Sequence, residues 1–536
     1  MRKQKKRLNL GQVFWYALSF GLMTFQLSCK DELAGVQNAD TMKEEMNASF
    51  AAKSFSGDSL LLENPYTVDN MTKALEKIKL NNPKYAAAGF KVHASHLYLK
   101  FIPQTPEEEG LLKKDSTTHY FDYRLDAEYK EGYLENRSPD QDSIPVYYTA
   151  VPVDKTLPNV KYEVLSELYI PEQDPYFANI KDNDEYLVNG TVNNTTDLFN
   201  NLVYLAYEQT GNEEELLTQN ATPEARWIFG KKWRPKGRIT ITDNCGPRST
   251  GEIGLEGAKI LMRQWFTVDS GITDANGYFQ TGTVRGKAKY VIQWERYQYS
   301  IRSGTFGQAE THGPNVKNQD WNYNIANGNP FLYGHIHRAA YHYYYKNIKN
   351  LRRPPENGFL NTQMKIGAFN YADPGGSNGN YSCYRRFLGI FPAIRIYNDN
   401  RTSCRIYGTT IHELGHASHW KMNRRAFRNT DSGVKESWAR GVQGELTKMQ
   451  YSDYSLAYDY RFNDYTGVVE DLIDNDGHFA NDSYNTNELV NGYTVKQIED
   501  ALNGKTTRLS WQNNIINLYS NPTKTQVPAV FNYWFP

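Results

Sequence analysis

The sequence predicts a multidomain α+β protein with an N-terminal α/β domain, a central β-sandwich and a C-terminal domain of mixed helices and strands. Its 536 residues exceed the length that one hydrophobic core usually spans, so about two to four domains are expected. Helix-like and strand-like patterns alternate over residues 61–225, whereas short strand-like runs separated by turn clusters fill residues 229–305. Residues 320–536 contain a helix-like segment, then strand-like runs, then a histidine-bearing helix.

The N-terminal domain is expected to follow a polar stretch at residues 29–60, which is typical of a flexible tether. "VDNMTKALEKIKL", at 68–80, carries apolar residues at helical spacing. "HLYLKFIP", at 96–103, alternates as a strand does, and "DLFNNLVYLAYEQTG", at 197–211, favours a second helix. These patterns predict an α/β domain over 61–225 and assign no chemistry to it.

The central strands are predicted from "GRITITD", "GAKILMR" and "KYVIQWER", which are short and rich in β-branched or aromatic residues. "GITDANGYFQTG" places Asp274, Asn276 and Gly277 at a hairpin turn. The order of these segments is similar to the carboxypeptidase-regulatory-like β-sandwich. That resemblance implies an accessory module over 229–305, which positions a neighbouring catalytic domain or binds a partner surface.

The third unit begins with "FLYGHIHRAAYHYYYKNIKNL", which predicts a helix, and continues with "MKIGAFNY" and "AIRIYND", which predict strands. His335, His337 and His342 lie on that helix, where structural or solvated histidines are the expected reading. "AIRIYND" is expected to be an edge strand on which an extended peptide lies by strand addition.

The first residues have the pattern of an export signal. "MRKQKKR" is basic, the apolar run "VFWYALSFGLMTF" is short for a membrane span, and Cys29 follows a small residue. This resembles a bacterial lipoprotein signal over 1–28, which implies a lipid anchor on Cys29 in the outer membrane. The "KDE" after Cys29 resembles the tag that sends Bacteroidetes-type lipoproteins to the cell surface. The alternative is an ordinary cleaved signal with a chance cysteine.

Charge and cysteine content exclude several classes. Lys and Arg number 60 and Asp and Glu number 60, and this balance argues against a nucleic-acid partner. The chain is also expected to be a monomer. No CxxC pair exists, so a cysteine-based zinc site is not expected. In an exported protein Cys383 and Cys404 could form a disulfide, which would leave Cys245 free; the sequence leaves the pairing open.

The chemistry is concentrated in "YGTTIHELGHASHWKMN", residues 407–423. Residues four apart share one face of an α-helix, so His412 and His416 can direct both imidazoles at one Zn²⁺ ion. Glu413 projects beside that face, where it can act as general base on a zinc-bound water. The spacing therefore predicts a catalytic zinc site.

The third ligand is expected outside this segment. His419 lies about 10 Å along the helix axis from His412, whereas zinc–nitrogen bonds are about 2 Å, so His419 is placed at the rim. The metzincin pattern is set aside, because Met422 occupies the position of its third histidine. "DSGVKESWARGVQGELTKM" follows downstream, with Glu436 opening a second predicted helix.

This spacing resembles the gluzincins, zinc peptidases of pattern HExxH…E. The resemblance implies His412, His416 and Glu436 as metal ligands and a zincin catalytic domain over 320–536. Glu445 is the competing ligand. The chain departs from the thermolysin-like members at Arg440, where those proteins have an aspartate.

The predicted function is zinc-dependent hydrolysis of peptide bonds in extracellular proteins or glycoproteins. The alternative is a non-catalytic adhesin or glycan-binding surface lipoprotein on a peptidase scaffold, although retention of Glu413 argues against it. Cleavage specificity and the residue that stabilises the oxyanion stay open; Tyr465 and His478 lie in the region where gluzincins often supply one.

Overall fold

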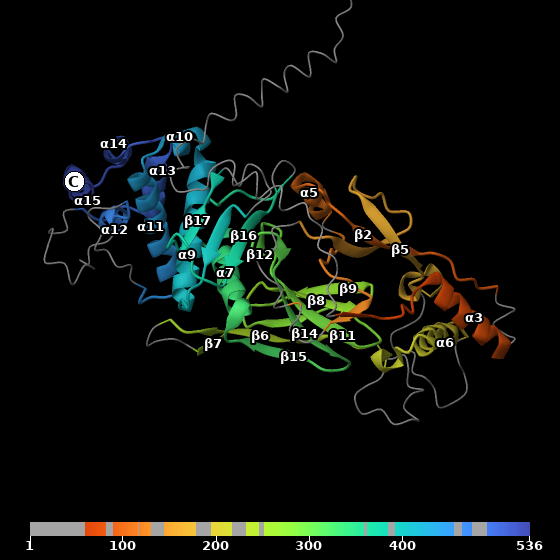
Figure 1. Cartoon of the computed structure of the whole chain (residues 1–536). Helices are drawn as coiled ribbons and strands as arrows, with labels where there is room; N and C mark the ends of the chain where they lie inside the picture. Colours follow the sequence, from red (N-terminus) through yellow and green to blue (C-terminus); the bar gives the residue numbers. More distant parts are fainter. Residues whose placement is uncertain are drawn as a thin grey trace, which may run out of the picture.

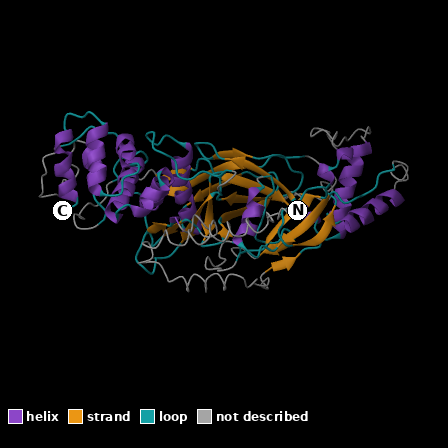
Figure 2. Ribbon diagram, turned by 90° about the horizontal axis from the view of Figure 1, so that it is seen from above, coloured by secondary structure: helices purple, strands orange, loops and turns teal. Residues whose placement is uncertain are grey.

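The computed structural model places the helices and strands of most of the chain. The residues that it describes are 59–81, 89–115, 117–129, 134, 144–177, 194–216, 232–245, 251–358, 362–383, 392–454, 464–473 and 490–536. The molecule is elongated, with α3 (Val68–Asn81) and α6 (Asn194–Gln209) at one end and C-terminal helices at the other (Figure 1). Seen from above, the strands lie between these two groups of helices (Figure 2). The predicted signal at 1–28 and Cys29 lie outside the described residues.

The N-terminal segment is mixed α and β, as expected. Its helices are α3 (Val68–Asn81), α5 (Pro106–Lys114) and α6 (Asn194–Gln209), with 3₁₀ turns η2 (Pro171–Gln173), η3 (Pro175–Phe177) and η4 (Glu213–Leu216), and its strands are β1 (Ser59–Leu61), β2 (His96–Phe101), β3 (Ala127–Tyr129), β4 (Tyr147–Pro152) and β5 (Tyr162–Leu168). β2 lies between β4 and β5, β1 pairs with β3, and every pair is antiparallel. The helices and the strand expected at 68–80, 197–211 and 96–103 are therefore present, and β1 begins inside the predicted tether.

The N-terminal segment shares a hydrophobic core with the central strands. Tyr66 and Tyr98 pack against Phe266, with ring centroids 6.2 Å and 4.9 Å away. All three side chains are buried, in one cluster with Trp265. Buried aromatic side chains contribute strongly to stability. Removal of this segment would expose Trp265 and Phe266 of the central strands to water.

The central strands form two four-stranded sheets. They are β6 (Lys236–Asp243), β7 (Gly251–Gly254), β8 (Lys259–Gln264), β9 (Thr267–Ile272), β10 (Tyr278–Gln280), β11 (Ala288–Gln293), β14 (Glu310–Val316) and β15 (Trp321–Ile325). In one sheet β6 lies between β10 and β15 and also pairs with β7; the order of the other is β14-β11-β8-β9. Ile239 of the first sheet and Ile260 and Ile292 of the second belong to one buried cluster. The two sheets thus share a core.

Two details differ from the expected sandwich. The turn at 274–277 joins β9 of one sheet to β10 of the other, so it is a connection between sheets and not a hairpin turn. The boundary at 305 also differs, because β14 and β15 lie beyond it, whereas β12 (Tyr299–Ser303) lies before it and pairs with β16 (Met364–Phe369) of the next sheet. Strand patterns in the sequence do not reveal which sheet a strand joins.

The third sheet carries the candidate site. Its order is β13 (Gly307–Gln308), β12, β16, β18 (Ile394–Tyr397) and β17 (Gly379–Tyr381). β12, β16 and β18 are parallel, and β17 runs antiparallel beside β18. The expectation that "AIRIYND" is an edge strand is wrong, because β18 is enclosed by β16 and β17. The glycine-rich loop before β17 turns the chain back, so that three residues pair outside β18.

Helices cover this sheet and extend to the C-terminus. They are α7 (Gly328–Tyr345), α9 (Ser403–Met422), α10 (Arg424–Asn429), α11 (Ser432–Lys448), α12 (Val468–Ile473), α13 (Val495–Leu502), α14 (Arg508–Leu518) and α15 (Val527–Trp534), with a 3₁₀ turn η6 (Lys524–Gln526) before α15. Ile336 of α7, Ile411 of α9 and Ile366 of β16 lie in one buried cluster, so both helices pack on the sheet. α9 and α11 lie side by side (Figure 1).

The histidines of α7 are structural, as expected. Each is buried, and each has a ring nitrogen within hydrogen-bond distance of a backbone carbonyl oxygen. For His335, His337 and His342 these distances are 3.2, 2.9 and 2.9 Å. Burial lowers the pKa of His337 to about 4, which keeps its imidazole neutral.

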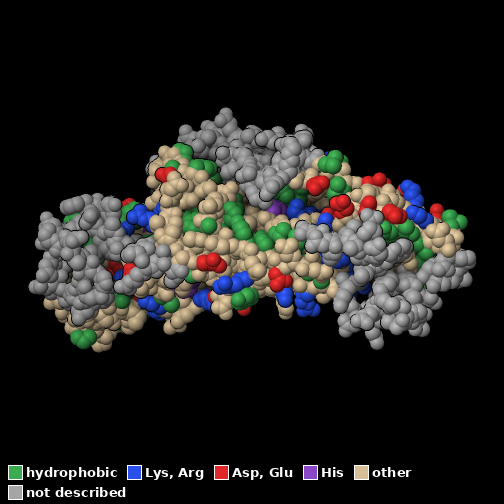
Figure 3. Space-filling view, turned by 90° about the horizontal axis from the view of Figure 1, so that it is seen from below, with side chains coloured by type: hydrophobic (Ala, Val, Ile, Leu, Met, Phe, Trp, Pro, Cys, Tyr) green, Lys and Arg blue, Asp and Glu red, His purple; other side chains and the backbone are tan. Residues whose placement is uncertain are grey.

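Two further features concern the distribution of surface charge and the apolar character of the helices. Acidic and basic side chains are interspersed over the face shown in Figure 3, which accords with the formal net charge of zero. Among the described helices, none combines the length and the apolar character that crossing a membrane requires.

Candidate metal centre

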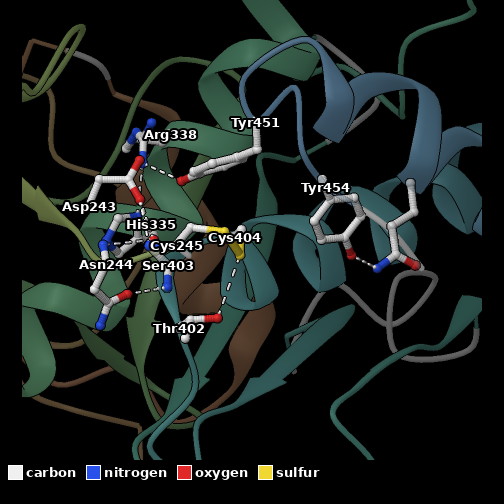
Figure 4. Close-up of a disulfide and its surroundings, with 11 residues drawn as sticks. Asp243, Asn244, Cys245, His335, Arg338, Thr402, Ser403, Cys404, Tyr451 and Tyr454 are labelled. Carbon is white, nitrogen blue, oxygen red and sulfur yellow. Dashed lines mark hydrogen bonds and ion pairs between the residues drawn. A yellow bond between two sulfur atoms is a disulfide. The ribbon is translucent and has the colours of Figure 1, made fainter. Parts of the chain in front are cut away.

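The start of α9 is fixed to the end of β6 by side chains that flank a disulfide (Figure 4). Asn244 Oδ1 accepts a hydrogen bond from the backbone N–H of Ser403, at 2.7 Å. Ser403 Oγ donates to Asp243 Oδ1, at 2.5 Å. The first of these bonds satisfies an N–H that has no partner within the helix. The helix with the HExxH sequence therefore starts from a defined point on the β-rich core.

The disulfide joins Cys245 and Cys404, with their Cα atoms 5.4 Å apart. The sequence left the pairing open and named Cys383 with Cys404 as one possibility; that bond does not form, and Cys245 is not free. Cys245 lies two residues after the end of β6, and this end of the strand lies against the first turn of α9. The two sulfur atoms therefore meet across a sequence separation of 159 residues. Cys383 is buried, forms no disulfide within the described part of the chain, and packs with Trp420 and Phe427.

Three side chains from α9 and α11 converge at the centre of the candidate site. His412 Nε2 and His416 Nε2 lie 3.1 Å apart, and Glu436 Oε2 lies 3.0 Å from the first and 3.2 Å from the second. His412 and His416 are one turn apart on α9, and Glu436 is in the first half of α11. Among the described residues, these three are the set of histidine, cysteine and acidic side chains that could hold a metal ion.

The three donor atoms fit a zinc ion. In a tetrahedral site with bonds of about 2.0–2.1 Å, neighbouring ligand atoms lie about 3.3–3.4 Å apart. The observed separations of 3.0 to 3.2 Å are within a few tenths of that value. Two imidazoles and one carboxylate are also a donor set found in catalytic zinc sites, where a fourth position stays available for water or substrate.

The two histidines of the site are buried, and the side chain of Glu436 is 24% exposed. His412 and His416 are each 6% exposed. Burial opposes ionisation of Glu436, but the charges and hydrogen bonds of His416 and His412 outweigh it and hold the pKa of Glu436 well below its usual range. Glu436 is therefore ionised at neutral pH, as a metal ligand must be.

Glu413 lies beside the triad and against the strand β17. Its side chain is 4% exposed. A Cβ atom at Gly379 of β17 would lie 3.0 Å from Glu413 Oε1 and 2.7 Å from Thr409 Cγ2. Only glycine lets the backbone of β17 approach α9 this closely without displacing one of them. The carboxylate of Glu413 is thereby held between its own helix and the strand.

Tyr465 also belongs to the site. Its ring stacks on that of His412, with centroids 5.9 Å apart and the two planes inclined by 30°. Its hydroxyl interacts with the Glu436 carboxylate, and burial together with the charges of Glu436 and Glu413 raises the pKa of the Tyr465 phenol. The phenol therefore stays protonated and can donate a hydrogen bond. The sequence named Tyr465 only as one candidate among 40 tyrosines, and His478 lies outside the described residues.

His419 and Glu445 lie away from the triad. His419 was expected at the rim, but it is 2% exposed, and its ring meets the ring of Phe427 edge-on at 5.0 Å. Burial and the positive charges of His416 and Lys435 lower the pKa of His419 to about 3, so His419 is a neutral packing residue. Glu445 Oε2 lies 2.6 Å from Lys349 Nζ and is paired there. Of the two carboxylates considered as third ligand, Glu436 is the one that reaches both histidines.

Comparisons with protein-family models, with curated proteins and with solved structures found no match to this chain.

Proposed function

We propose that the chain hydrolyses peptide bonds with a zinc ion held by His412, His416 and Glu436. The observation that carries this proposal is the convergence of three metal-donor atoms next to a buried carboxylate on the same helix. A structural zinc site would have four protein ligands and no need of Glu413. Three ligands with an adjacent carboxylate favour a catalytic site in a zincin-like domain.

Each side chain has a role in such a reaction. A zinc ion bound at this site would act as a Lewis acid, polarising the carbonyl of the scissile bond and acidifying a water molecule. Glu413 takes a proton from the attacking water and later gives it to the nitrogen of the departing amine. Tyr465 donates a hydrogen bond to the carbonyl oxygen as negative charge develops on it.

The substrates we propose are extracellular proteins or glycoproteins, because the first 29 residues have the pattern of a lipoprotein signal. A lipid on Cys29 would anchor the chain to the outer membrane with the candidate site facing outwards. Incorporation of labelled fatty acid into the wild type but not into Cys29→Ala would support the anchor. Equal labelling of both chains would reject it.

Zinc content tests the ligand set. The wild type is expected to retain one zinc ion per chain after dialysis, and Glu436→Ala is expected to lose it, because two imidazoles alone hold the ion too weakly. Glu445→Ala is the matched control, since Glu445 is on the same helix and is paired with Lys349. Zinc loss from Glu445→Ala and not from Glu436→Ala would reverse the assignment.

Peptide profiles test the activity. Metal-free protein reloaded with one equivalent of zinc is expected to cleave a mixture of denatured proteins, with the peptides read by mass spectrometry. Identical peptide profiles from reloaded wild type and reloaded Glu413→Ala would reject the peptidase proposal. They would favour the alternative, a non-catalytic adhesin or glycan-binding protein.

A further inference from the structure

A half-buried arginine without a carboxylate partner lies beside the general base. Arg401 is in the loop between β18 and α9. Its Nη2 donates to Thr409 Oγ1, at 2.9 Å, and its Nη1 is buried without a hydrogen-bond partner. Within the part of the chain that the structure describes, Arg401 forms no ion pair. Burial lowers the pKa of Arg401, which reflects the cost of keeping its charge out of water.

Other cations gather around the same place. Arg401, Arg405 and Arg440 all lie close enough to Tyr454 to lower the pKa of its phenol, against the larger upward effect of burial. Tyr454 is held on α9 and α11: its hydroxyl accepts from Gln443 Nε2 at 2.8 Å (Figure 4 shows the ring). No acidic residue is among the groups that shift Tyr454 or Arg401. The charged side chains that act on the Tyr454 phenol are therefore arginines.

This cationic group is next to the proposed reaction centre. Thr409, the partner of Arg401, is one helical turn before Glu413, a rise of about 6 Å along the helix. Thr409 and Glu413 also lie under the same residue of β17, because a Cβ at Gly379 would contact both. An extended peptide advances about 3.3 Å per residue, so a side chain adjacent to a bond cleaved at Glu413 can reach the guanidinium.

A purely structural role does not account for Arg401. The single side-chain hydrogen bond to Thr409 uses one of the five N–H groups of the guanidinium. A buried, uncompensated charge destabilises a protein, whereas a charge that meets an opposite charge on its ligand is neutralised when the ligand binds. Arginine also has the planar geometry that binds a carboxylate through two hydrogen bonds.

We propose that Arg401, with Arg405 and Tyr454 beside it, binds a carboxylate of the substrate next to the scissile bond. This specificity site rests on the proposed peptidase function. The carboxylate can come from an Asp or Glu side chain of the peptide or from an acidic sugar attached to it. Both sources supply the carboxylate that Arg401 recognises, but they place it at different distances from the peptide backbone.

Matched peptides test the site. We expect the zinc-loaded wild type to cleave a peptide with Glu next to the scissile bond about 10- to 100-fold faster, in kcat/KM, than the same peptide with Gln, the range for one charge-assisted pair. Arg401→Gln should bring that ratio to about 1, and Arg401→Lys should retain part of it, because a charge remains. Arg424→Gln, which removes an arginine stacked on Trp420, is the control that keeps the wild-type ratio.

Glycopeptides that differ only in an acidic or neutral sugar distinguish the two sources of the carboxylate. A preference for the acidic sugar alone assigns the site to glycans, and a preference for Glu alone assigns it to the peptide. Equal cleavage of acidic and neutral substrates of both kinds by wild type would overturn the specificity site and leave the peptidase proposal intact.

Binding separates failure of the site from failure of the peptidase. Fluorescence anisotropy on Glu413→Gln should show the same preference for the Glu peptide without turnover. If no peptide is cleaved by wild type, this preference, lost in Arg401→Gln, still supports a carboxylate site. Equal binding of the Glu and Gln peptides would reject it.

Discussion

Glu413→Gln is expected to lower the rate of peptide hydrolysis by about 10²- to 10⁴-fold while the chain keeps one zinc ion, the range for loss of a positioned general base. Glutamine has nearly the same shape as glutamate, so the packing of this 4%-exposed side chain against β17 is preserved. It cannot accept the proton of water at neutral pH. The measurement is kcat on a quenched-fluorescence peptide, together with the zinc content of the same sample.

The control for this variant is Glu356→Gln, which removes an exposed carboxylate paired with Lys421 of α9. It makes the same chemical change outside the site and should leave kcat within about twofold, as surface pairs contribute little. An unchanged kcat in Glu413→Gln would remove the proposed base from the reaction. Loss of zinc in that variant would instead show that Glu413 acts as a ligand.

The second large effect is expected at Glu109, which joins the N-terminal segment to the sheet of the candidate site. Glu109 and Arg302 are each 1% exposed. Glu109 Oε1 accepts from Tyr147 Oη at 2.7 Å and from Arg302 Nη1 at 3.2 Å, and Glu109 Oε2 lies 3.1 Å from Lys365 Nζ. Burial opposes its ionisation, yet Lys365 and Arg302 lower the pKa of Glu109 to about 2.

Glu109→Gln should lower the free energy of unfolding by about 3–5 kcal/mol, because it leaves Arg302 and Lys365 buried without their counter-charge. Urea unfolding at neutral pH measures this difference. Glu163→Gln is the control: Glu163 and Lys100 form a pair 3.1 Å apart that is 49% and 27% exposed, so a change below about 1 kcal/mol is expected.

The pH dependence gives an independent check. A carboxylate with a lowered pKa contributes fully above its unfolded pKa of 4.5 and loses that contribution as the pH falls toward about 2. The stability gap between wild type and Glu109→Gln should therefore narrow over this interval. A gap that stays constant as the pH falls through this interval, from 4.5 toward about 2, would show that the charge of Glu109 is not what stabilises the fold.

The two histidines of the candidate site were predictable because their geometry is local. His412 and His416 lie one turn apart on a helix, which fixes their common face in any fold. The prediction of Glu436 depended on its distance in sequence from His416 and on a second helix. In the structure its carboxylate lies within hydrogen-bond distance of both imidazoles. Tyr465 had no such signal, since nothing in its local sequence distinguishes it from the other tyrosines.

Features that depend on sheet order could not be predicted. Cys245 meets Cys404 only because the end of β6 lies beside the start of α9. The sequence suggested that β18 is an edge strand, because β17 has only three residues and is too short to show a strand pattern. β12 has the same kind of strand pattern in its sequence as the strands before and after it, yet it pairs with β16 of the third sheet.

The most direct test of the central claim is to digest denatured proteins in water enriched in ¹⁸O and to read the new peptide termini by mass spectrometry. Zinc-loaded wild type is expected to generate new carboxyl termini that carry one solvent oxygen, and metal-free wild type none until zinc is restored. New termini that are the same with and without zinc, or no new termini from the zinc-loaded chain, would contradict a zinc-dependent peptidase centred on His412, His416 and Glu436.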